Sequence, residues 1–350
     1  MPLAELRITN LRCIESAGLA FSPDLNLIVG ENGAGKTSVL EAIFLLGRGR
    51  SFRTRNSEKL IRHGQESLMV FGATDDSPQS VAGVQVTREG TRARINGRDA
   101  ESLVALSSVM PVQSIDPEIH KLIDQGPERR RRWLDWLVFH VEPSFALHWI
   151  RYQRSLKQRN AALKSRGDPA AWDLALIEHG SAMTEARRAA LDRLGPYLQT
   201  LFGAFSGLEV SAGFFTGWSQ EHSLADALRD SSARDRERGI TSVGPHRADV
   251  ILKTKGRSAR ETLSRGQQKL TAVAMIVSQL KMLRDEKGVS AVLLLDDPAA
   301  ELDERNLRLL FQELMSLKCQ MIATSLRPEI AFYQSPKSTF HVEQGRVLRV

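Results

Sequence analysis

The sequence predicts an α/β protein in which both ends of the chain form one body and a mainly helical lobe is inserted between them. A continuous apolar run at residues 25–30 leads into a glycine-rich loop and then into helical spacing from Lys36 to Leu46. A second apolar run, residues 292–295, ends on two aspartates near the other end of the chain. Such runs are typical of parallel strands that are buried on both faces, so we expect the two chain ends to share one body.

The N-terminal third reads as strands on either side of that first unit. Residues 4–15, AELRITNLRCIE, alternate between apolar and polar side chains as a strand does. Residues 66–99 read as short strands and turns, and Asn96–Gly97 is the dipeptide most typical of a tight hairpin.

The middle of the chain changes to helical spacing from about residue 117 to 203. This stretch holds four of the five tryptophans, and its prolines predict repeated helix starts and stops. These prolines are Pro117, Pro127, Pro143, Pro169 and Pro196. An uninterrupted heptad run does not survive them, so we expect no long coiled coil.

Strand-like text returns at residues 208–215 and 248–256. A helix around 264–284, the strand ending at residue 295, a helix from about 303 to 318 and a buried strand at 319–325 follow. We therefore expect an α/β lobe from residues 1–115 and 240–350 and an inserted helical lobe from 116–239, with the helix around 264–284 packing on the helical lobe.

Charge, cysteine content and apolar runs indicate the kind of partner and the cellular compartment to expect. The 350 residues carry 48 Lys and Arg against 41 Asp and Glu, a net charge of +7, which favours a polyanionic partner without requiring one. Cys13 and Cys319 have no metal-ligand or disulfide spacing. The N-terminus lacks a signal-peptide profile and no apolar run is long enough to span a bilayer, so we expect a cytoplasmic protein without a membrane partner.

The loop GENGAGKT fits the pattern of a phosphate-binding loop between a strand and a helix. Glycines let backbone amides approach phosphates, Lys36 reaches the β- and γ-phosphates, and the Thr37 hydroxyl is placed to ligate Mg²⁺. The expected binding residues are Gly30, Glu31, Asn32, Gly33, Ala34, Gly35, Lys36 and Thr37.

Two further motifs suggest chemistry. Asp296 and Asp297 follow a buried strand at the sheet edge where α/β proteins bind ligands, so we expect Asp296 to hold Mg²⁺ and Asp297 to orient or deprotonate the attacking water. In LSRGQQKL at 263–270, Ser264 and Gly266 open a helix and offer a hydroxyl and free amides to an anion. Taken alone, an ordinary helix N-cap is the better interpretation of Ser264.

In combination these motifs resemble a known family. GENGAGKT, LSRGQQ, VLLLDD and AELD at 300–303, in this order, resemble an ABC-type ATPase head, and the long gap between loop and carboxylates resembles its SMC-like branch. A transporter subunit would normally have a shorter gap and an LSGGQ-like signature. The segments 48–54, 126–136 and 244–249 further resemble blocks of the RecF family of bacterial recombinational repair proteins.

The resemblance implies roles for single residues, with ATP and Mg²⁺ as cofactors. Gln113 falls where the family's Q-loop glutamine contacts metal and water, although an ordinary strand glutamine remains an alternative. Ser264, Gly266 and Gln267 would meet the γ-phosphate of ATP held by a second subunit, and Asp303 would be the D-loop aspartate at the dimer interface. Many ABC heads have Glu where Asp297 stands. The switch histidine has no counterpart, which leaves Thr324 or Ser325 as weak candidates.

The resemblance also implies a function. We expect an ATP-dependent homodimer that closes on DNA gaps or junctions with little sequence preference, a weak DNA-stimulated ATPase whose hydrolysis opens it, and RecR as a partner. The implied context is DNA replication, recombinase loading and the SOS response. The alternative is an ABC-type ATPase subunit that acts on a partner other than DNA.

Two basic clusters are candidates for DNA contacts, with solvated surface as the alternative for each. They are Arg48, Arg50, Arg53 and Arg55, and Lys253, Lys255, Arg257 and Arg260. The run Arg129 to Arg132 points around a helix, and the i,i+4 spacing favours a structural pair of Arg131 with Asp135. His246 is interpreted as structural.

Overall fold

The computed structural model describes residues 2–326 and 335–350. The chain divides into two compact units: Met1–Ile119 with Leu283–Val350, here called unit 1, and His120–Met282, called unit 2. Unit 1 therefore joins the two chain ends, as the two apolar runs predict.

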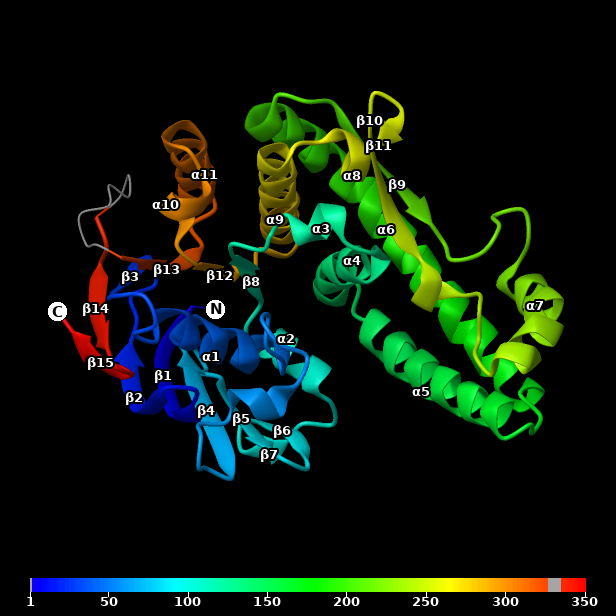
Figure 1. Ribbon diagram of the computed structural model, residues 1–350, viewed down its shortest axis with the longest axis horizontal. Coiled ribbons are helices and arrows are strands. Elements are labelled where there is room, and N and C mark those ends of the chain that lie inside the picture. The colour runs from blue at the N-terminus through cyan, green and yellow to red at the C-terminus, as the bar shows by residue number, and fades with distance from the viewer. Residues whose placement is uncertain (1, 327–334) are drawn as a thin grey trace. The chain divides into compact units, whose positions relative to one another are not determined.

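A mostly parallel sheet holds the distant segments of unit 1 together (Figure 1). Its order is β15 (Arg346–Arg349), β14 (Ser338–Glu343), β3 (Leu25–Val29), β13 (Gln320–Ser325), β12 (Val292–Leu295) and β8 (Val112–Ile115). All neighbours pair in parallel except β14 and β15. Every residue of β3, β12 and β13 is buried, and apart from Asn26 and Gln320 their side chains are apolar or small, as expected for strands covered on both faces.

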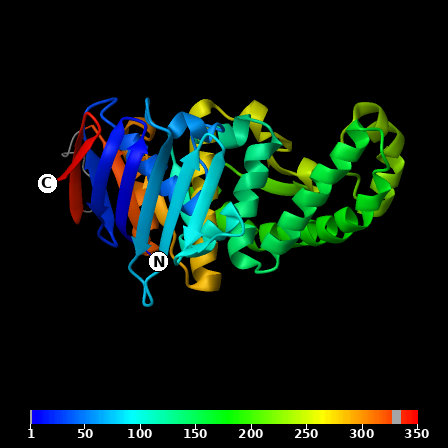
Figure 2. The same ribbon diagram turned by 90° about the horizontal axis from the view of Figure 1, so that it is seen from below.

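An antiparallel sheet forms the other layer of unit 1 (Figure 2). Its order is β2 (Ile14–Ala20), β1 (Leu3–Leu11), β4 (Ser67–Thr74), β5 (Val81–Thr87), β6 (Gly90–Ile95) and β7 (Arg98–Asp99). The alternating segment 4–15 is a hairpin rather than one strand, because the chain turns at Arg12, whose φ is 51°. The predicted turn at Asn96–Gly97 is confirmed, with φ of 50° and 81°.

Helix α1 (Lys36–Arg48) supplies apolar side chains to the core shared by the two sheets. Val39, Leu40 and Ile43 have no exposed surface and pack with apolar residues of both layers. Shorter elements complete unit 1: η1 (Ser57–Leu60), η2 (Leu103–Ala105), α2 (Leu106–Val109), α10 (Pro298–Glu301) and α11 (Glu304–Ser316). Because α1 begins directly after the glycine loop, its burial fixes the loop in place.

Unit 2 is mainly helical and includes one small antiparallel sheet of β9 (Val210–Phe215), β10 (Asp249–Thr254) and β11 (Arg257–Ser258). Its helices are α3 (Lys121–Asp124), α4 (Pro127–Val141), α5 (Phe145–Lys164), η3 (Ala170–Trp172), α6 (Asp173–Ser206), α7 (Leu224–Arg238), η4 (Pro245–Arg247) and α8 (Ala259–Thr262). Helix α9 (Arg265–Lys287) starts in unit 2 and ends in unit 1.

The compact units differ from the expected domain boundaries at residues 116–119, which belong to unit 1, and at residues 240–282, which belong to unit 2. The reason for the second difference is strand pairing, because β10 pairs with β9 from Thr254–Val210 to Asp249–Phe215. Helix α9 is held there too: the Trp133 indole donates to the Met275 carbonyl at 3.3 Å, and the Gln279 amide donates to the Trp133 carbonyl at 2.6 Å.

One predicted helix break is wrong. Pro127 starts α4, as expected, but Pro196 lies inside α6, a helix of 34 residues that does not end there. Pro196 lies on the exposed side of the helix, while Leu194 and Leu198 on either side of it are buried. Burial of the apolar face on both sides therefore outweighs the hydrogen bond that proline cannot make.

Candidate functional site: the phosphate loop and its carboxylates

The glycine loop of unit 1 has a conformation that side chains would disturb. At Gly30 an added Cβ would lie 2.2 Å from the Val342 carbonyl oxygen, and Gly35, directly before α1, has φ of 120°. Glycine is required at both positions for these steric reasons. The loop therefore brings its backbone close to β14 and leads directly into the N-terminus of α1, and a helix N-terminus favours an anion.

Lys36 lies over this loop. Its Nζ donates to the carbonyl oxygens of Gly30 at 2.6 Å and Glu31 at 2.9 Å, and the residue is 8% exposed. Burial lowers the pKa of Lys36, while the charges of Asp297 and Asp296 act in the opposite direction. The ammonium thus lies beside the carbonyl groups of the loop that is predicted to bind phosphate.

Three separate segments of unit 1 meet beside the loop. The Thr37 hydroxyl donates to Asp296 at 3.0 Å (Oδ1) and 3.1 Å (Oδ2). The Thr324 hydroxyl, from the neighbouring strand β13, donates to Asp296 Oδ1 at 2.8 Å. Asp296 is thereby oriented toward α1 by hydroxyls from two sides. Thr324, which the sequence offered only as a substitute for the switch histidine, is in contact with the expected metal carboxylate.

Asp297 has an unusual backbone. Its φ and ψ are 48° and 55°, in the left-handed region, and its amide donates to the Thr324 hydroxyl at 2.9 Å. Asp adopts this region more readily than most side chains, but the conformation costs energy and is held by the surrounding contacts. This left-handed residue lies between the end of β12 and the start of α10, where the chain changes direction.

The oxygen donors of Thr37 and Asp296 fit Mg²⁺. This ion takes one or two protein oxygens and completes its octahedron with water and phosphate, so a hydroxyl and a carboxylate 3.0 Å apart suffice. Among the residues that the structure describes, His, Cys, Asp and Glu side chains do not gather into a metal cluster of three or more. A site that needs a nucleotide phosphate to be complete agrees with both observations.

Gln113 does not lie with these residues. It pairs with Leu293 on β12, three residues before Asp296, which corresponds to about 10 Å along a strand. It is 4% exposed, and its Oε1 accepts a hydrogen bond from Arg48 Nη2 at 2.9 Å. The part of β8 beside Asp296 is its end, where the Asp296 amide donates to the Ile115 carbonyl at 3.0 Å.

Arg48, expected as a DNA contact, is directed into unit 1. Besides Gln113 it donates to the Val112 carbonyl at 3.0 Å, and its guanidinium lies 5.2 Å from the centre of the Phe44 ring. Burial, followed by the charge of Arg50, lowers the pKa of Arg48. Of its cluster, Arg53 and Arg55 are exposed and Arg50 is half-buried.

The LSRGQQ motif lies in unit 2, at the start of α9. The Ser264 amide donates to Gln267 Oε1 at 3.0 Å, and the Gln267 amide approaches the Ser264 hydroxyl at 3.4 Å. This reciprocal pair is a capping box, so the N-cap interpretation of Ser264 is confirmed. Ser264, Arg265 and Gly266 are exposed. The helix end is therefore formed and open on one side.

The remaining candidates occupy helix ends or internal contacts. Asp303 caps α11 by accepting from the Asn306 amide at 2.9 Å, and hydrogen bonds from Asn306 lower the pKa of this carboxyl. The expected pair of Arg131 with Asp135 is wrong. Asp135 instead accepts two hydrogen bonds from Arg187, at 2.7 and 2.9 Å, and Arg131 donates to the Ala248 carbonyl at 2.7 Å.

His246 lies in a buried polar network of unit 2. Its Nδ1 is 2.7 Å from the Tyr152 hydroxyl, and its Nε2 is 3.0 Å from the Thr241 carbonyl oxygen. Burial lowers the pKa of His246 to about 4 and raises that of Tyr152. These contacts are those of a structural histidine.

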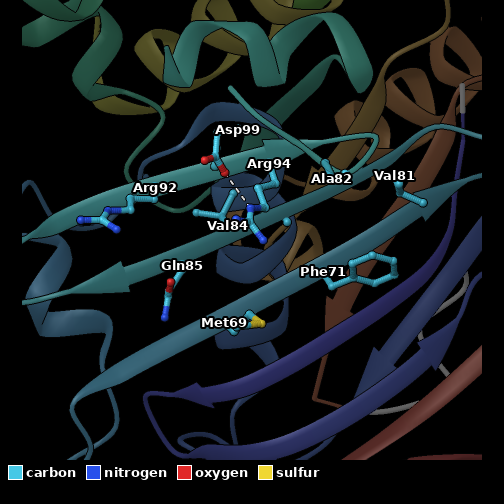
Figure 3. A pocket seen from close by; sticks show the side chains of 12 residues that line it. Met69, Phe71, Val81, Ala82, Val84, Gln85, Arg92, Arg94 and Asp99 are labelled. Carbon is cyan, nitrogen blue, oxygen red and sulfur yellow. Dashed lines mark hydrogen bonds and ion pairs between the residues drawn. The ribbon is translucent and has the colours of Figure 1, made fainter. Parts of the chain in front are cut away.

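A hollow of about 470 Å³ on the antiparallel sheet does not involve the candidate site (Figure 3). Met69, Phe71 and Val81 line it, and Arg94, another lining residue, donates a hydrogen bond to Asp99 at 2.6 Å.

The helices within the described ranges are all too short or too polar to cross a membrane.

Comparison with known proteins agrees with the motif order. A profile of the RecF/RecN/SMC N-terminal domain matches residues 2–346. The DNA replication and repair protein RecF of Xanthomonas euvesicatoria pv. vesicatoria is 42% identical over 364 residues, which cover 100% of this chain and 99% of that protein. The chain belongs to the RecF family. RecF of Pseudomonas fluorescens is 36% identical over 359 residues, covering 99% of this chain and 98% of that protein.

Solved structures confirm the predicted fold class of an ABC-type ATPase head, and the helices of the described residues include no long coiled coil. A structure described as the recombination mediator protein RecF with ATP, in the RecFOR pathway, superposes with a TM-score of 0.89 at 26% identity, covering 100% of this chain and 97% of that one. An Smc head bound to a ScpA domain reaches a TM-score of 0.61 at 16% identity, which supports the fold alone. The RecF family therefore shares the SMC-head architecture described above.

Proposed function

We propose that the chain is an ATP-dependent DNA-binding protein of recombinational repair. In this proposal two copies sandwich ATP and close on DNA at gaps or junctions, and hydrolysis releases them. The contact of Thr37, Asp296 and Thr324 beside Lys36 carries the proposal, because it unites the expected phosphate-binding and metal-binding groups in one place. RecF relatives named for DNA replication and repair support the DNA part.

The residues of unit 1 have distinct tasks in this proposal. Lys36 exchanges its carbonyl partners for the β- and γ-phosphates of ATP, and Thr37 and Asp296 hold Mg²⁺, which would neutralise charge on the phosphates. Thr324 keeps Asp296 turned toward Thr37. Asp297 orients the attacking water and accepts its proton. Gln113 keeps its predicted role only if it leaves Arg48, since its amide oxygen is already engaged there.

The second half of the site comes from the other copy. Ser264 and Gly266 are exposed at the N-terminus of a 23-residue helix, where amides and the helix dipole favour an anion. We propose that they meet the γ-phosphate of ATP bound to the partner, with Asp303 close to the dimer interface. ATP then acts as removable glue between two copies. A RecFOR-pathway relative supports RecR as a further partner.

Asp297→Asn tests this function. The amide keeps the shape of the carboxylate but cannot accept a proton, so ATP hydrolysis should fall about a hundredfold or more while ATP binding changes less than about threefold. The variant should accumulate as an ATP-bound dimer and leave DNA more slowly than the parent. Asp285→Asn, an exposed aspartate near the end of α9, is the matched control and should behave as the parent.

Two results would contradict the proposal. An Asp297→Asn protein that stops hydrolysing ATP yet leaves DNA at the parent rate would separate hydrolysis from release. If DNA changes neither the ATPase rate nor the dimerisation of the parent protein, the alternative is favoured: an ABC-type ATPase that acts on a partner other than DNA.

A further inference from the structure

The small sheet of unit 2 has one packed face and one open face. Val210, Val250 and Leu252 are buried, and β9 and β10 pack on α6 and α4 with that side. The opposite side chains lie in register, with Gly213 opposite Ile251 and Ser211 opposite Lys253. We call the exposed side the β9–β10 face; its residues are Ser211, Gly213, Phe215, Ile251 and Lys253.

Two large apolar side chains are open on this face. Phe215 is 42% exposed and Ile251 is 38% exposed, and Gly213 adds no side chain between them. Asp249 lies opposite Phe215, but its carboxylate is neutralised by two hydrogen bonds from Arg130, at 2.8 and 2.9 Å. The exposed aromatic ring is therefore paired across the sheet with a carboxylate that already has a cation.

Positive charge borders the same face. Lys253 lies on it, Lys255 occupies the turn into β11, and Arg257 and Arg260 follow; all four are exposed. The exposed carboxylates nearest in sequence are Glu209, before β9, and Glu261, on α8. Four exposed cations and two exposed anions are thus close in sequence to one end of this face, on the small sheet labelled β9, β10 and β11 in Figure 1.

We propose that the β9–β10 face binds single-stranded DNA. Phe215 would stack against a base, Ile251 would pack beside it, and Lys253, Lys255 and Arg257 would contact the phosphates that follow. Single strands expose the flat faces of their bases, whereas a duplex buries them, so an open phenylalanine beside cations favours the single strand. The inference deepens the proposed function, on which it rests, by naming the DNA surface and the form of DNA.

The same face is connected to the signature loop by a short segment of the chain that includes α8. Arg260 is four residues before Ser264, and α8 lies between the face and the loop. The buried Gln268 amide of α9 donates to the Arg260 carbonyl at 3.1 Å and to the Leu263 carbonyl at 3.2 Å. Gln268 is thus a positioning residue that holds α8 against the start of α9, so a bound strand at the face can shift Ser264.

The first test removes the phosphate contacts. The full chain carrying Lys253→Ala, Lys255→Ala and Arg257→Ala together should bind a fluorescent oligo(dT) at least about tenfold more weakly. The slope of log affinity against log salt should become about 2 units shallower, since each phosphate contact in a single strand contributes about 0.7. The matched control replaces three exposed arginines of α7, Arg234, Arg236 and Arg238, with Ala and should stay within about twofold of the parent.

The second test separates stacking from charge. Phe215→Ala should weaken oligo(dT) binding about tenfold without changing the salt slope, and Phe215→Trp should restore it, because stacking needs the ring and not a charge. The control is Ile240→Ala, at another exposed apolar residue of unit 2, which is 38% exposed. Binding of a blunt duplex of equal length should hardly respond to Phe215→Ala. An equal loss for the duplex would overturn the single-strand assignment.

The third test addresses the path to the signature loop. Gln268→Met keeps the side-chain size but removes both donors, so oligo(dT) binding should remain while the stimulation of ATP hydrolysis by oligo(dT) is lost. Stimulation equal to the parent's would overturn this path. If the parent binds no DNA, the proposed function itself fails. If the parent binds oligo(dT) and the triple variant binds it equally well, only the inference about the face fails.

Discussion

The phosphate loop and the signature loop are built in opposite ways. Around the phosphate loop, the groups come from segments as distant as Thr37, Asp296 and Thr324, and they already contact one another. In the signature loop, the hydrogen bonds at the helix end are made within four residues, between Ser264 and Gln267. Ser264 and Gly266 are exposed.

The difference indicates which half of the proposed ATP site depends on the fold and which on a second copy. The groups around Lys36 have mutual partners inside unit 1, so the fold alone can orient them before a ligand arrives. The Ser264 loop has a formed helix end but exposed donors, which suits a surface that completes its contacts only when a partner approaches. Substitutions in the two loops should therefore affect different steps.

The largest effect is expected at the buried loop. Lys36→Ala removes the ammonium that lies over the loop, so ATP affinity should fall about a hundredfold or more, and dimerisation should be lost with it. Equilibrium binding of a fluorescent ATP analogue and light scattering with ATP measure the two effects. The exposed Lys59→Ala is a control for loss of charge. Parent-like dimerisation of the Lys36 variant would show that the dimer does not depend on ATP bound at this loop.

The signature loop should show the reverse pattern. Ser264→Arg places a long side chain where the partner's phosphate would approach, so ATP affinity should stay within about twofold while the ATP-dependent dimer is lost. Mixing this variant with Lys36→Ala sharpens the test, because a mixed dimer can form only one intact site and that site needs Ser264 from the Lys36 variant. Loss of ATP binding by isolated Ser264→Arg monomers would show that Ser264 acts within its own subunit.

A smaller effect is expected at Thr324. Thr324→Val keeps the shape but removes the hydroxyl that orients Asp296, and loss of such an outer contact typically weakens metal binding about tenfold. The Mg²⁺ concentration that gives half-maximal ATPase activity should rise accordingly. Thr324→Ser, which keeps the hydroxyl, should restore the parent value. An unchanged Mg²⁺ requirement in the valine variant would assign Thr324 a purely structural role at Asp297.

The smallest effect on nucleotide chemistry is expected in the network around His246. Its pKa is lowered to about 4 in the folded chain, whereas an unfolded histidine titrates near 6.5. Between these values the unfolded state binds more protons, so the free energy of unfolding should fall as the pH drops from 6.5 to 4. His246→Gln should remove up to about 3 kcal/mol of this acid-side loss, measured by denaturation at several pH values.

The exposed His63→Gln is the control for that series and should leave the pH dependence unchanged. ATP binding should be the same in both histidine variants at pH 7.5. If His246→Gln keeps the full pH dependence of the parent, other groups of unit 2 cause it.

Elements that depend on residues close together in the chain can be predicted from the amino-acid sequence alone. The glycine loop was predicted at residues 30–37 and lies there, between the buried strand β3 and the buried helix α1. Ser264 caps α9, as the Ser–x–x–Gln spacing indicates. Each of these depends on residues fewer than ten positions apart, whose geometry is set by backbone sterics and helix-end hydrogen bonding.

Contacts between distant segments could not be predicted in this way, because they depend on how the whole chain packs. The register of β8 places Gln113 opposite Leu293 and within reach of Arg48, and Asp135 pairs with Arg187 rather than with its helical neighbour Arg131. Residues 240–282 join unit 2 because β10 pairs with β9. A strand's periodicity shows which face is buried but not which residue of another strand lies opposite, since that alignment is fixed by the packing of the whole sheet.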